Sequence, residues 1–277
     1  MISEGETQGE IRLLLVVHYD GTHFFGWQIQ AEGRTVQGEL ENAVARLTEA
    51  KRTVTGAGRT DRGVHAVGQV ASVTLPAKWT AGSFRKAMNA VLPFDVWIAE
   101  AREVPPAFHP RFDAVARSYE YRVGLREATD SPFHRPWCWR VEQPLSVEHL
   151  GEAAGYLKGE HSFKAFAKSG QPHLGERCRV QHAEWVPWDD LGTTLTITAN
   201  RYLHHMVRYL VGTMVDIARG RRPMDDLPAL LQGAGHLTTS PPAPPRGLFL
   251  SRVEYAAEAV EPGASTPRTP RSRENGA

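Results

Sequence analysis

The sequence has few cysteines, no long apolar run and almost no net charge. Its 277 residues include two cysteines, Cys138 and Cys178, which form no Cys-x-x-Cys motif. This argues against a disulfide framework and favours a reducing, cytoplasmic setting. No apolar run approaches the ~20 residues that a membrane-spanning helix needs. The acidic, polar start of the sequence is unlike a signal peptide. We therefore expect a cytoplasmic protein with no membrane partner.

The charge balance gives no indication of a nucleic-acid partner by itself. Lysine and arginine together number 32 and aspartate and glutamate 31, which leaves a formal net charge of +1. A nucleic-acid surface would therefore have to come from local basic clusters. Such clusters occur at Arg59 with Arg62, at Arg135 with Arg140 and at residues 219–222. Each cluster alone is more often an ordinary solvated surface.

Apolar periodicity predicts an α+β fold. The composition, 41% apolar and 23% charged, is that of a globular protein, and the length allows one large domain or two lobes. The predicted helices are residues 35–49, 83–91, 146–157, 203–217 and 224–232. The predicted strands are residues 11–19, 51–55, 64–75, 96–104, 117–123, 179–186, 195–199 and 247–255. The polar segments 1–10 and 256–277 are expected to be flexible and disordered, respectively.

Residues 56–65, Gly-Ala-Gly-Arg-Thr-Asp-Arg-Gly-Val-His, are the most distinctive stretch. Three glycines in eight residues permit tight turns that other residues resist. Asp61 lies between Arg59 and Arg62, and nearby arginines favour the charged form of a carboxyl group. The stretch could therefore present a nucleophilic carboxylate. It could equally be a surface turn in which arginines neutralise an aspartate.

Several other chemistries lack their motifs. Asp61 stands where the dinucleotide fingerprint has its third glycine and would repel pyrophosphate, and no Gly-Lys-Ser/Thr phosphate loop is present. No His-Glu-x-x-His zinc motif occurs. His204 and His205, as helix neighbours about 100° apart, would be poorly placed to share a metal. Glycoside hydrolysis needs a second carboxylate, which only the fold could bring to Asp61. We expect neither a cofactor nor a metal.

What remains is a carboxylate with arginines and tyrosines, a set that suits chemistry on an extruded nucleobase. In the predicted strand 117–123, Tyr119 and Tyr121 share one face, which in most strands belongs to a core. In the predicted helix 203–217, Arg208 lies off the apolar stripe. It therefore faces either a functional site or solvent.

These motifs, in this order, closely resemble those of the tRNA pseudouridine synthase A family. The most specific are residues 56–66 and the His-Met-Val-Arg sequence at 205–208. The resemblance covers nearly all of residues 11–255. It also includes residues 19–21, 25–28, 108–112, 117–121, 159–163, 166, 203–204 and 244–248.

The resemblance implies a cofactor-free isomerisation of uridine to pseudouridine in tRNA, usually at positions 38 to 40 of the anticodon arm. The residue matching Asp61 is the nucleophile, and the one matching Arg59 pairs with it and helps to extrude the target nucleotide. Tyr119 would stack on the flipped base and is a candidate for removing the carbon-5 proton. Arg208 would pair with Asp61, and Leu248 would line the pocket.

The same resemblance implies two ferredoxin-like lobes, residues 11–123 and 124–255, with antiparallel sheets joined around a central cleft. It also implies a homodimer with tRNA across both subunits. The sequence departs from the family at Arg62, often a smaller residue, at residues 200–202 and after Tyr255. Two alternatives are an inactive tRNA-binding module and a hydrolase that uses Asp61 with a distant carboxylate. The intact Arg59, Asp61 and Tyr119 argue against loss of catalysis.

Overall fold

The computed structural model describes residues 9–168 and 175–261. The strands in this part of the chain are β1 (Glu10–Tyr19), β2 (Thr55–Gly56), β3 (His65–Pro76), β4 (Val96–Val104), β5 (Ala114–Gly124), β6 (Trp139–Arg140), β7 (Gly159–Ser162), β8 (Arg177–Trp188), β9 (Gly192–Ala199) and β10 (Leu248–Tyr255). The α-helices are α1 (Val36–Thr48), α2 (Ala81–Val91), α3 (Val147–Tyr156), α4 (Met206–Ala218), α5 (Asp226–Leu231) and α6 (Ala257–Val260).

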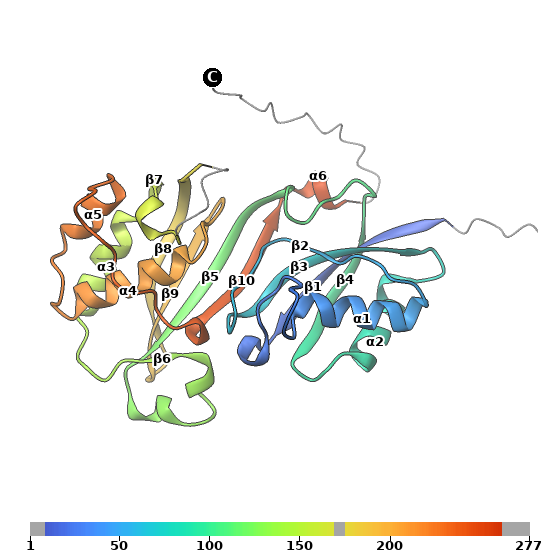
Figure 1. Ribbon diagram of the computed structural model, residues 1–277, viewed down its shortest axis with the longest axis horizontal. Helices are drawn as coiled ribbons and strands as arrows, with labels where there is room; N and C mark the ends of the chain where they lie inside the picture. Colours follow the sequence, from blue (N-terminus) through green and yellow to red (C-terminus); the bar gives the residue numbers. More distant parts are fainter. Residues whose placement is uncertain (1–8, 169–174, 262–277) are drawn as a thin grey trace, which may run out of the picture.

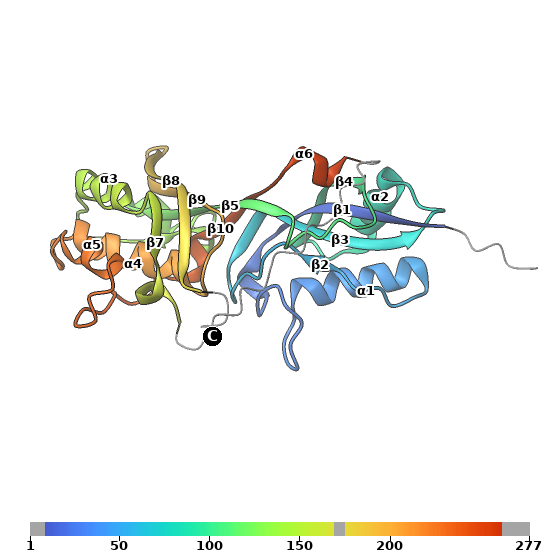
Figure 2. The same ribbon diagram turned by 90° about the horizontal axis from the view of Figure 1, so that it is seen from above.

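One continuous sheet runs the length of the molecule in the order β4-β1-β3-β10-β5-β9-β8-β7, with β2 and β6 paired beside it. Helices α1 and α2 lie beside one end of the sheet, and α3, α4 and α5 lie beside the other (Figures 1 and 2). Strands β5 and β10 lie between the two groups. The prediction of an α+β fold is confirmed. None of the described helices has the length and apolar character to cross a membrane.

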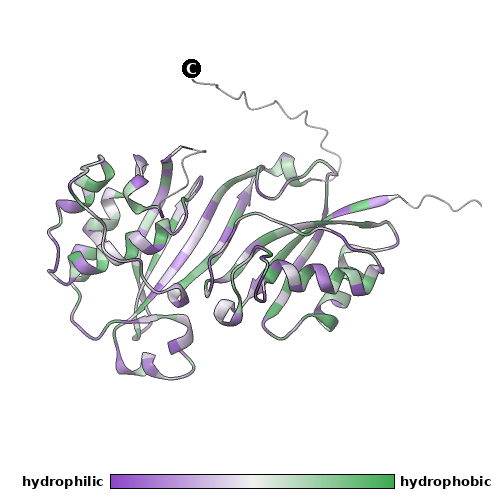
Figure 3. Ribbon diagram, viewed as in Figure 1, coloured by the Kyte–Doolittle hydropathy of each residue, from purple (hydrophilic) through white to green (hydrophobic). Residues whose placement is uncertain are grey.

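The N-terminal half forms because its apolar periodicities match the elements. Leu13, Leu14 and Leu15 are all buried, since β1 is paired on both edges and covered on both faces. Each such side chain stabilises the fold by roughly 1.5–3 kcal/mol. Helix α1 begins where predicted, with the Thr35 hydroxyl accepting a hydrogen bond from the Gly38 amide at 3.3 Å. In Figure 3 this helix alternates between hydrophobic and hydrophilic residues, as a helix with one face on a core should.

The C-terminal half has its own core beneath α3, α4 and α5. Helix α4 contributes the apolar stripe that the sequence predicts, including Val207, Leu210 and Met214, all buried. Helix α3 is capped by the Ser146 hydroxyl, which accepts from the His149 amide at 3.1 Å. Tyr119, on β5, packs against both cores. The core of each half is therefore separate, but the strands between them are shared.

Strand β10 connects the two halves. Leu248 belongs to the C-terminal core, whereas Leu250 and Val253 belong to the N-terminal core. The strand is antiparallel to β5 but parallel to β3, so the joined sheet is mixed rather than wholly antiparallel. The division of the chain at residue 123 stays a prediction. The topology adds that β10, from the second predicted lobe, packs into the core of the first.

Several predicted boundaries differ from the structure. The predicted strand 51–55 is reduced to β2, Thr55–Gly56. Helix α2 begins before residue 83 because Thr80 caps it, accepting from the Ser83 amide at 3.2 Å. Helix α4 begins at Met206 rather than at residue 203. The predicted disordered tail begins too early, because α6 follows β10 and buries Val260 against the N-terminal core. Residues 1–8 and 262–277 of the predicted flexible ends lie outside the described residues.

The contact between β3 and β10 depends on Gly68. A Cβ atom at this position would lie 2.0 Å from the backbone oxygen of Ser251, a distance that no side chain can occupy. We expect Gly68→Ala to lower the free energy of unfolding by about 1–3 kcal/mol, because the two strands must move apart. Urea unfolding followed by circular dichroism measures this change.

The matched control for this prediction is Gly151→Ala. Gly151 lies within α3, and a Cβ atom there meets nothing within 4 Å. Alanine is the better helix former, so this variant should gain about 0.5–1 kcal/mol. Equal stabilities of the two variants would contradict the close approach at Gly68.

Candidate active site

Residues 57–64 form a loop between β2 and β3 that is fixed by hydrogen bonds to the N-terminal half. The Ala57 amide donates to the Val70 oxygen at 2.7 Å, and the Trp27 amide donates to the Thr60 oxygen at 3.1 Å. The Tyr19 and Thr60 hydroxyls are 2.8 Å apart. Gly63 has φ +76°, a left-handed conformation that favours glycine. These bonds therefore hold the backbone around Asp61 in a fixed position.

The Asp61 carboxylate lies against the start of α4, from the other half of the molecule. Its Oδ1 is 3.3 Å from His204 Nε2, and its Oδ2 is 3.3 Å from His205 Nε2. Arg208 Nη1 donates to Oδ2 at 3.4 Å, and Arg208 Nε donates to the Ala243 oxygen at 2.8 Å. Arg208 is thus held at two points. It faces Asp61 rather than solvent, and its position off the apolar stripe has a structural reason.

Tyr119 lies near this group. Its ring meets that of Tyr202 edge-on, with centroids 4.9 Å apart. Burial raises the pKa of Tyr119 to about 12, the Asp61 carboxylate adds to the rise and Arg117 opposes it. The phenol therefore keeps its proton at neutral pH. Its neighbour Tyr121 is fully buried in the C-terminal core and donates to the Pro244 oxygen at 2.7 Å.

Two further predicted residues lie apart from Asp61. Arg59 is exposed, and among the described residues the ion pairs of Asp61 are with His204, His205 and Arg208, not with Arg59. Leu248 is buried in the C-terminal core, opposite Tyr121 in the sheet. The roles expected for Arg59 and Leu248 stay predictions.

Sequence reasoning placed His204 and His205 wrongly. They precede α4, and His205 takes a left-handed conformation with φ +65°, uncommon for a residue other than glycine. Their rings lie 4.1 Å apart and both face Asp61. The signal in the sequence was the His-His pair itself, but a helical geometry was assumed for it. Strained conformations of this kind cluster at functional sites.

Asp61, His204 and His205 could also hold a metal ion, because their ligand atoms all lie within 4.8 Å of one another. Such a set resembles the nitrogen and oxygen donors of zinc sites. The Arg208 guanidinium, 3.4 Å from the same carboxylate, opposes a cation there. The arrangement is better suited to fixing a carboxylate between one guanidinium and two imidazoles.

The sequence leaves the role of Arg62 open, and the structure shows which residue its side chain contacts. Its guanidinium lies over the Phe25 ring, 4.2 Å from the centroid. Phe25 is partly exposed, whereas its neighbours Phe24 and Trp27 are buried. The aromatic segment 24–27 is therefore mainly a packing element beneath the loop 57–64.

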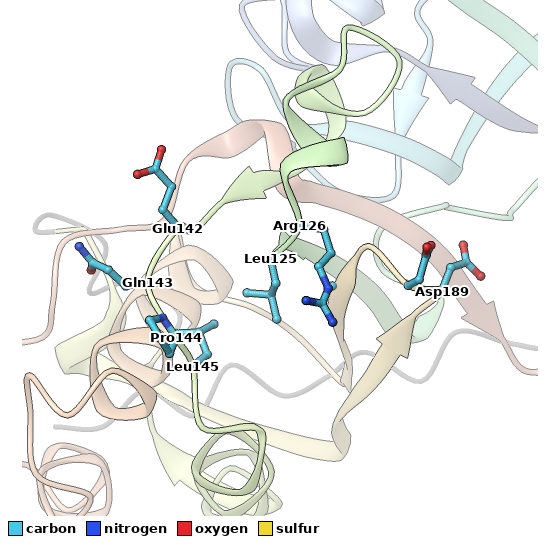
Figure 4. Close-up of a pocket in the computed structure, with 9 residues that line it drawn as sticks. Leu125, Arg126, Glu142, Gln143, Pro144, Leu145 and Asp189 are labelled. Carbon is cyan, nitrogen blue, oxygen red and sulfur yellow. The ribbon is translucent and has the colours of Figure 1, made fainter.

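A cavity of about 410 Å³ lies elsewhere in the C-terminal half (Figure 4). It contains none of the predicted site residues. Its lining residues are Leu125, Arg126, Glu142, Gln143, Pro144, Leu145, Asp189, Asp190 and Gly192. A second cavity, of about 260 Å³, adjoins the loop 57–64 at Gly58 and Arg59.

Comparisons with known proteins identify the family of the chain. A family model described as tRNA pseudouridine synthase matches residues 15–113 and 153–256. The chain belongs to this family. It is 41% identical over 245 residues to tRNA pseudouridine synthase A of Moorella thermoacetica, covering 88% of this chain and 99% of that protein. It is 39% identical over 259 residues to tRNA pseudouridine synthase A of Myxococcus xanthus, covering 92% and 97% respectively.

Similarity to solved structures is more distant. The crystal structure of the archaeal box H/ACA sRNP Nop10-Cbf5 complex matches 89% of this chain and 49% of that one, with a TM-score of 0.30 and 9% identity. The matched ranges of the tRNA pseudouridine synthase family model include the loop 57–64 and the start of α4.

The electrostatic link between these groups can be measured at His205. Burial holds the pKa of His205 below its ordinary value, Asp61 opposes this shift, and His204, Arg208 and Lys168 reinforce it. We expect Arg208→Gln to raise the pKa of His205 and Asp61→Asn to lower it further. NMR titration of the imidazole protons measures both changes, and the exposed His182 is the control. Unchanged midpoints in both variants would contradict the contacts described.

Proposed function

We propose that the protein isomerises uridine to pseudouridine in tRNA, with Asp61 as the nucleophile. The observation that carries the proposal is the contact between Asp61 on the catalytic loop and Arg208 on α4. These residues are 147 positions apart in the sequence. Membership of the tRNA pseudouridine synthase family and the names of the curated relatives support the reaction.

The reaction exchanges one bond for another within a single nucleotide. The bond from N1 of uracil to the ribose breaks, a bond from C5 to the same ribose carbon forms, the C5 hydrogen leaves as a proton, and N1 takes up a proton in its place. Asp61 attacks either the base or the ribose, and it is released when the new bond is complete. No electron acceptor or donor is consumed, so the chemistry requires no redox cofactor.

The neighbouring residues position the reacting groups. Arg208, fixed by the Ala243 oxygen, orients the carboxylate and compensates its charge. Tyr119 offers an aromatic face on which the extruded base can stack. Because its phenol stays protonated at neutral pH, stacking suits Tyr119 better than removal of the carbon-5 proton does. Arg59, exposed on the same loop, is free to enter the RNA and take the place of the extruded nucleotide. Leu248, on β10 opposite Tyr121, would line the pocket for the base.

We extend the proposal to uridines 38 to 40 of the anticodon arm, to a homodimer with tRNA across both subunits and to a cytoplasmic location. The formal charge of +1 does not conflict with tRNA binding, because phosphate contacts depend on a local basic stripe, which a dimer would double. Two buried, unpaired cysteines support a reducing compartment.

The alternatives have less support. A hydrolase requires a second carboxylate near Asp61. In the described part of the chain, the ion-pair partners of Asp61 are two imidazoles and a guanidinium. An inactive tRNA-binding module would not need the fixed contact between Asp61 and Arg208.

Asp61→Asn should abolish tritium release from tRNA labelled at C5 of uridine, because the amide is a poor nucleophile of similar shape. Binding of the tRNA, measured by filter retention, should remain. The matched control is Asp189→Asn, at a turn far from the site. Substantial tritium release by the Asp61 variant would rule out the nucleophile assignment.

Arg208→Gln should lower kcat by about 10²–10³-fold, the usual effect of removing one preorganised charged donor. Single-turnover tritium release measures the rate of the chemical step, and thermal unfolding checks that the fold is retained. Arg219→Gln, just beyond the end of the same helix, serves as the control. A near-normal rate for the Arg208 variant would assign that residue to structure alone.

A further inference from the structure

A cavity of about 260 Å³ lies beside the catalytic loop, outside the group around Asp61. Gly58 and Arg59 of the loop form one wall. The turn before β5 forms another wall, with His109, Arg111 and Phe112. The cavity is smaller than the 300–1,000 Å³ typical of drug-sized ligands, so it suits a single small ring system.

The wall formed by the turn before β5 is held rigidly. The His109 amide donates to Asp113 Oδ2 at 2.7 Å, and His109 Nδ1 accepts from the amides of Arg111 and Phe112 at 3.1 and 3.3 Å. These bonds close the turn on itself. The positions of Arg111 and Phe112 are therefore set before any ligand binds, which reduces the entropy lost on binding.

One arginine joins this wall to the catalytic loop. Arg117 Nη2 donates to the Arg111 oxygen at 2.7 Å and to the Ala57 oxygen at 3.1 Å. The distance between the two walls is therefore fixed by the protein itself. A ligand in the cavity would be held at a constant distance from the loop that carries Asp61.

The exposed side chains of the wall are of the types that bind single-stranded nucleic acid. Phe112 is 64% exposed, although it is a large apolar residue. Its ring lies 4.2 Å from that of His109, at 33°. The Arg111 guanidinium lies 6.0 Å from the centroid of the Phe112 ring. Aromatic platforms beside arginines bind bases by stacking and phosphates by charge.

We propose that this cavity is a second nucleotide subsite, which receives the base of an unpaired nucleotide next to the target uridine. The base stacks on Phe112, and its phosphate lies between Arg111 and Arg59. The proposal rests on the proposed function, because the ligand is part of the same RNA. The subsite would make the enzyme sensitive to the nucleotide beside its target, through contacts that Asp61 does not make.

The test uses an RNA hairpin with the sequence of an anticodon arm, carrying tritium at C5 of the target uridine. Phe112→Ala should raise KM by about 5- to 100-fold, the equivalent of one lost base stack, with kcat nearly unchanged. Phe112→Trp should restore KM, because tryptophan also stacks, whereas Phe112→Leu should not. Phe133→Ala is the matched control, since Phe133 is 77% exposed on another segment. An unchanged KM for Phe112→Ala, or an equal rise for Phe133→Ala, would overturn the subsite.

Gly58→Val tests the cavity from its other wall. A Cβ atom at Gly58 meets nothing within 4 Å, so a valine side chain can narrow the cavity without a clash with the protein. This variant should raise KM as Phe112→Ala does, with an unchanged melting temperature. An unchanged KM would mean that the base binds elsewhere.

A binding measurement separates failure of the subsite from failure of the proposed function. The hairpin is prepared with 2-aminopurine in turn at each unpaired position next to the target. Stacking on Phe112 should quench its fluorescence with the wild-type protein and not with Phe112→Ala. Absence of tritium release from the wild type would overturn the proposed function, whereas absence of quenching at every position would overturn the subsite. Free uridine monophosphate in excess should not restore the fluorescence, which assigns the site to RNA rather than to a mononucleotide.

Discussion

The contact between one carboxylate and the start of one helix determines how the rest of the molecule is arranged. Asp61 is carried by a loop of the N-terminal half, and its partners His204, His205 and Arg208 come from the C-terminal half. Neither half contains the site alone. The distance between the halves must therefore stay nearly constant, because charge pairing weakens as the groups separate. The continuous sheet provides that constancy.

The sheet gains its rigidity from a strand that belongs to both halves. Apolar residues of β10 enter the C-terminal core at Leu248 and the N-terminal core at Leu250. Shifting one half against the other would disturb both cores as well as the hydrogen bonds of β3, β5 and β10. Tyr119, opposite Leu250 in the sheet, places its ring beside the same junction. The aromatic face and the carboxylate are thereby aligned by the backbone rather than by flexible side chains.

Much of this arrangement could be predicted from the sequence, for reasons that differ between residues. The stripe of Val36, Leu40 and Val44 repeats with the helical period, so α1 was readily identified. The placement of Arg208 off a similar stripe left two environments open, a functional site or solvent, and the structure places Arg208 against Asp61. His205 was misplaced because its left-handed backbone depends on contacts with residues far away in the sequence. Composition does not encode such contacts.

The connection of the halves was equally beyond local patterns. Residues 247–255 were predicted as a strand, but the alternation of apolar residues does not specify which strands will be its neighbours. The parallel pairing with β3 is possible because Gly68 has no side chain, a requirement that is apparent only when Ser251 lies opposite it. The family resemblance supplied the order of the motifs, and the structure supplied their distances.

The place of β10 in the chain has a consequence for biosynthesis. It is the last of the described strands, yet it lies in the middle of the sheet between β3 and β5. During translation, the edges of β3 and β5 stay unpaired until residues 248–255 have left the ribosome. Exposed strand edges attract other chains, so the nascent protein is open to misassembly until β10 has been synthesised. The two halves, and with them the groups around Asp61, can come together fully only after β10 has entered the sheet.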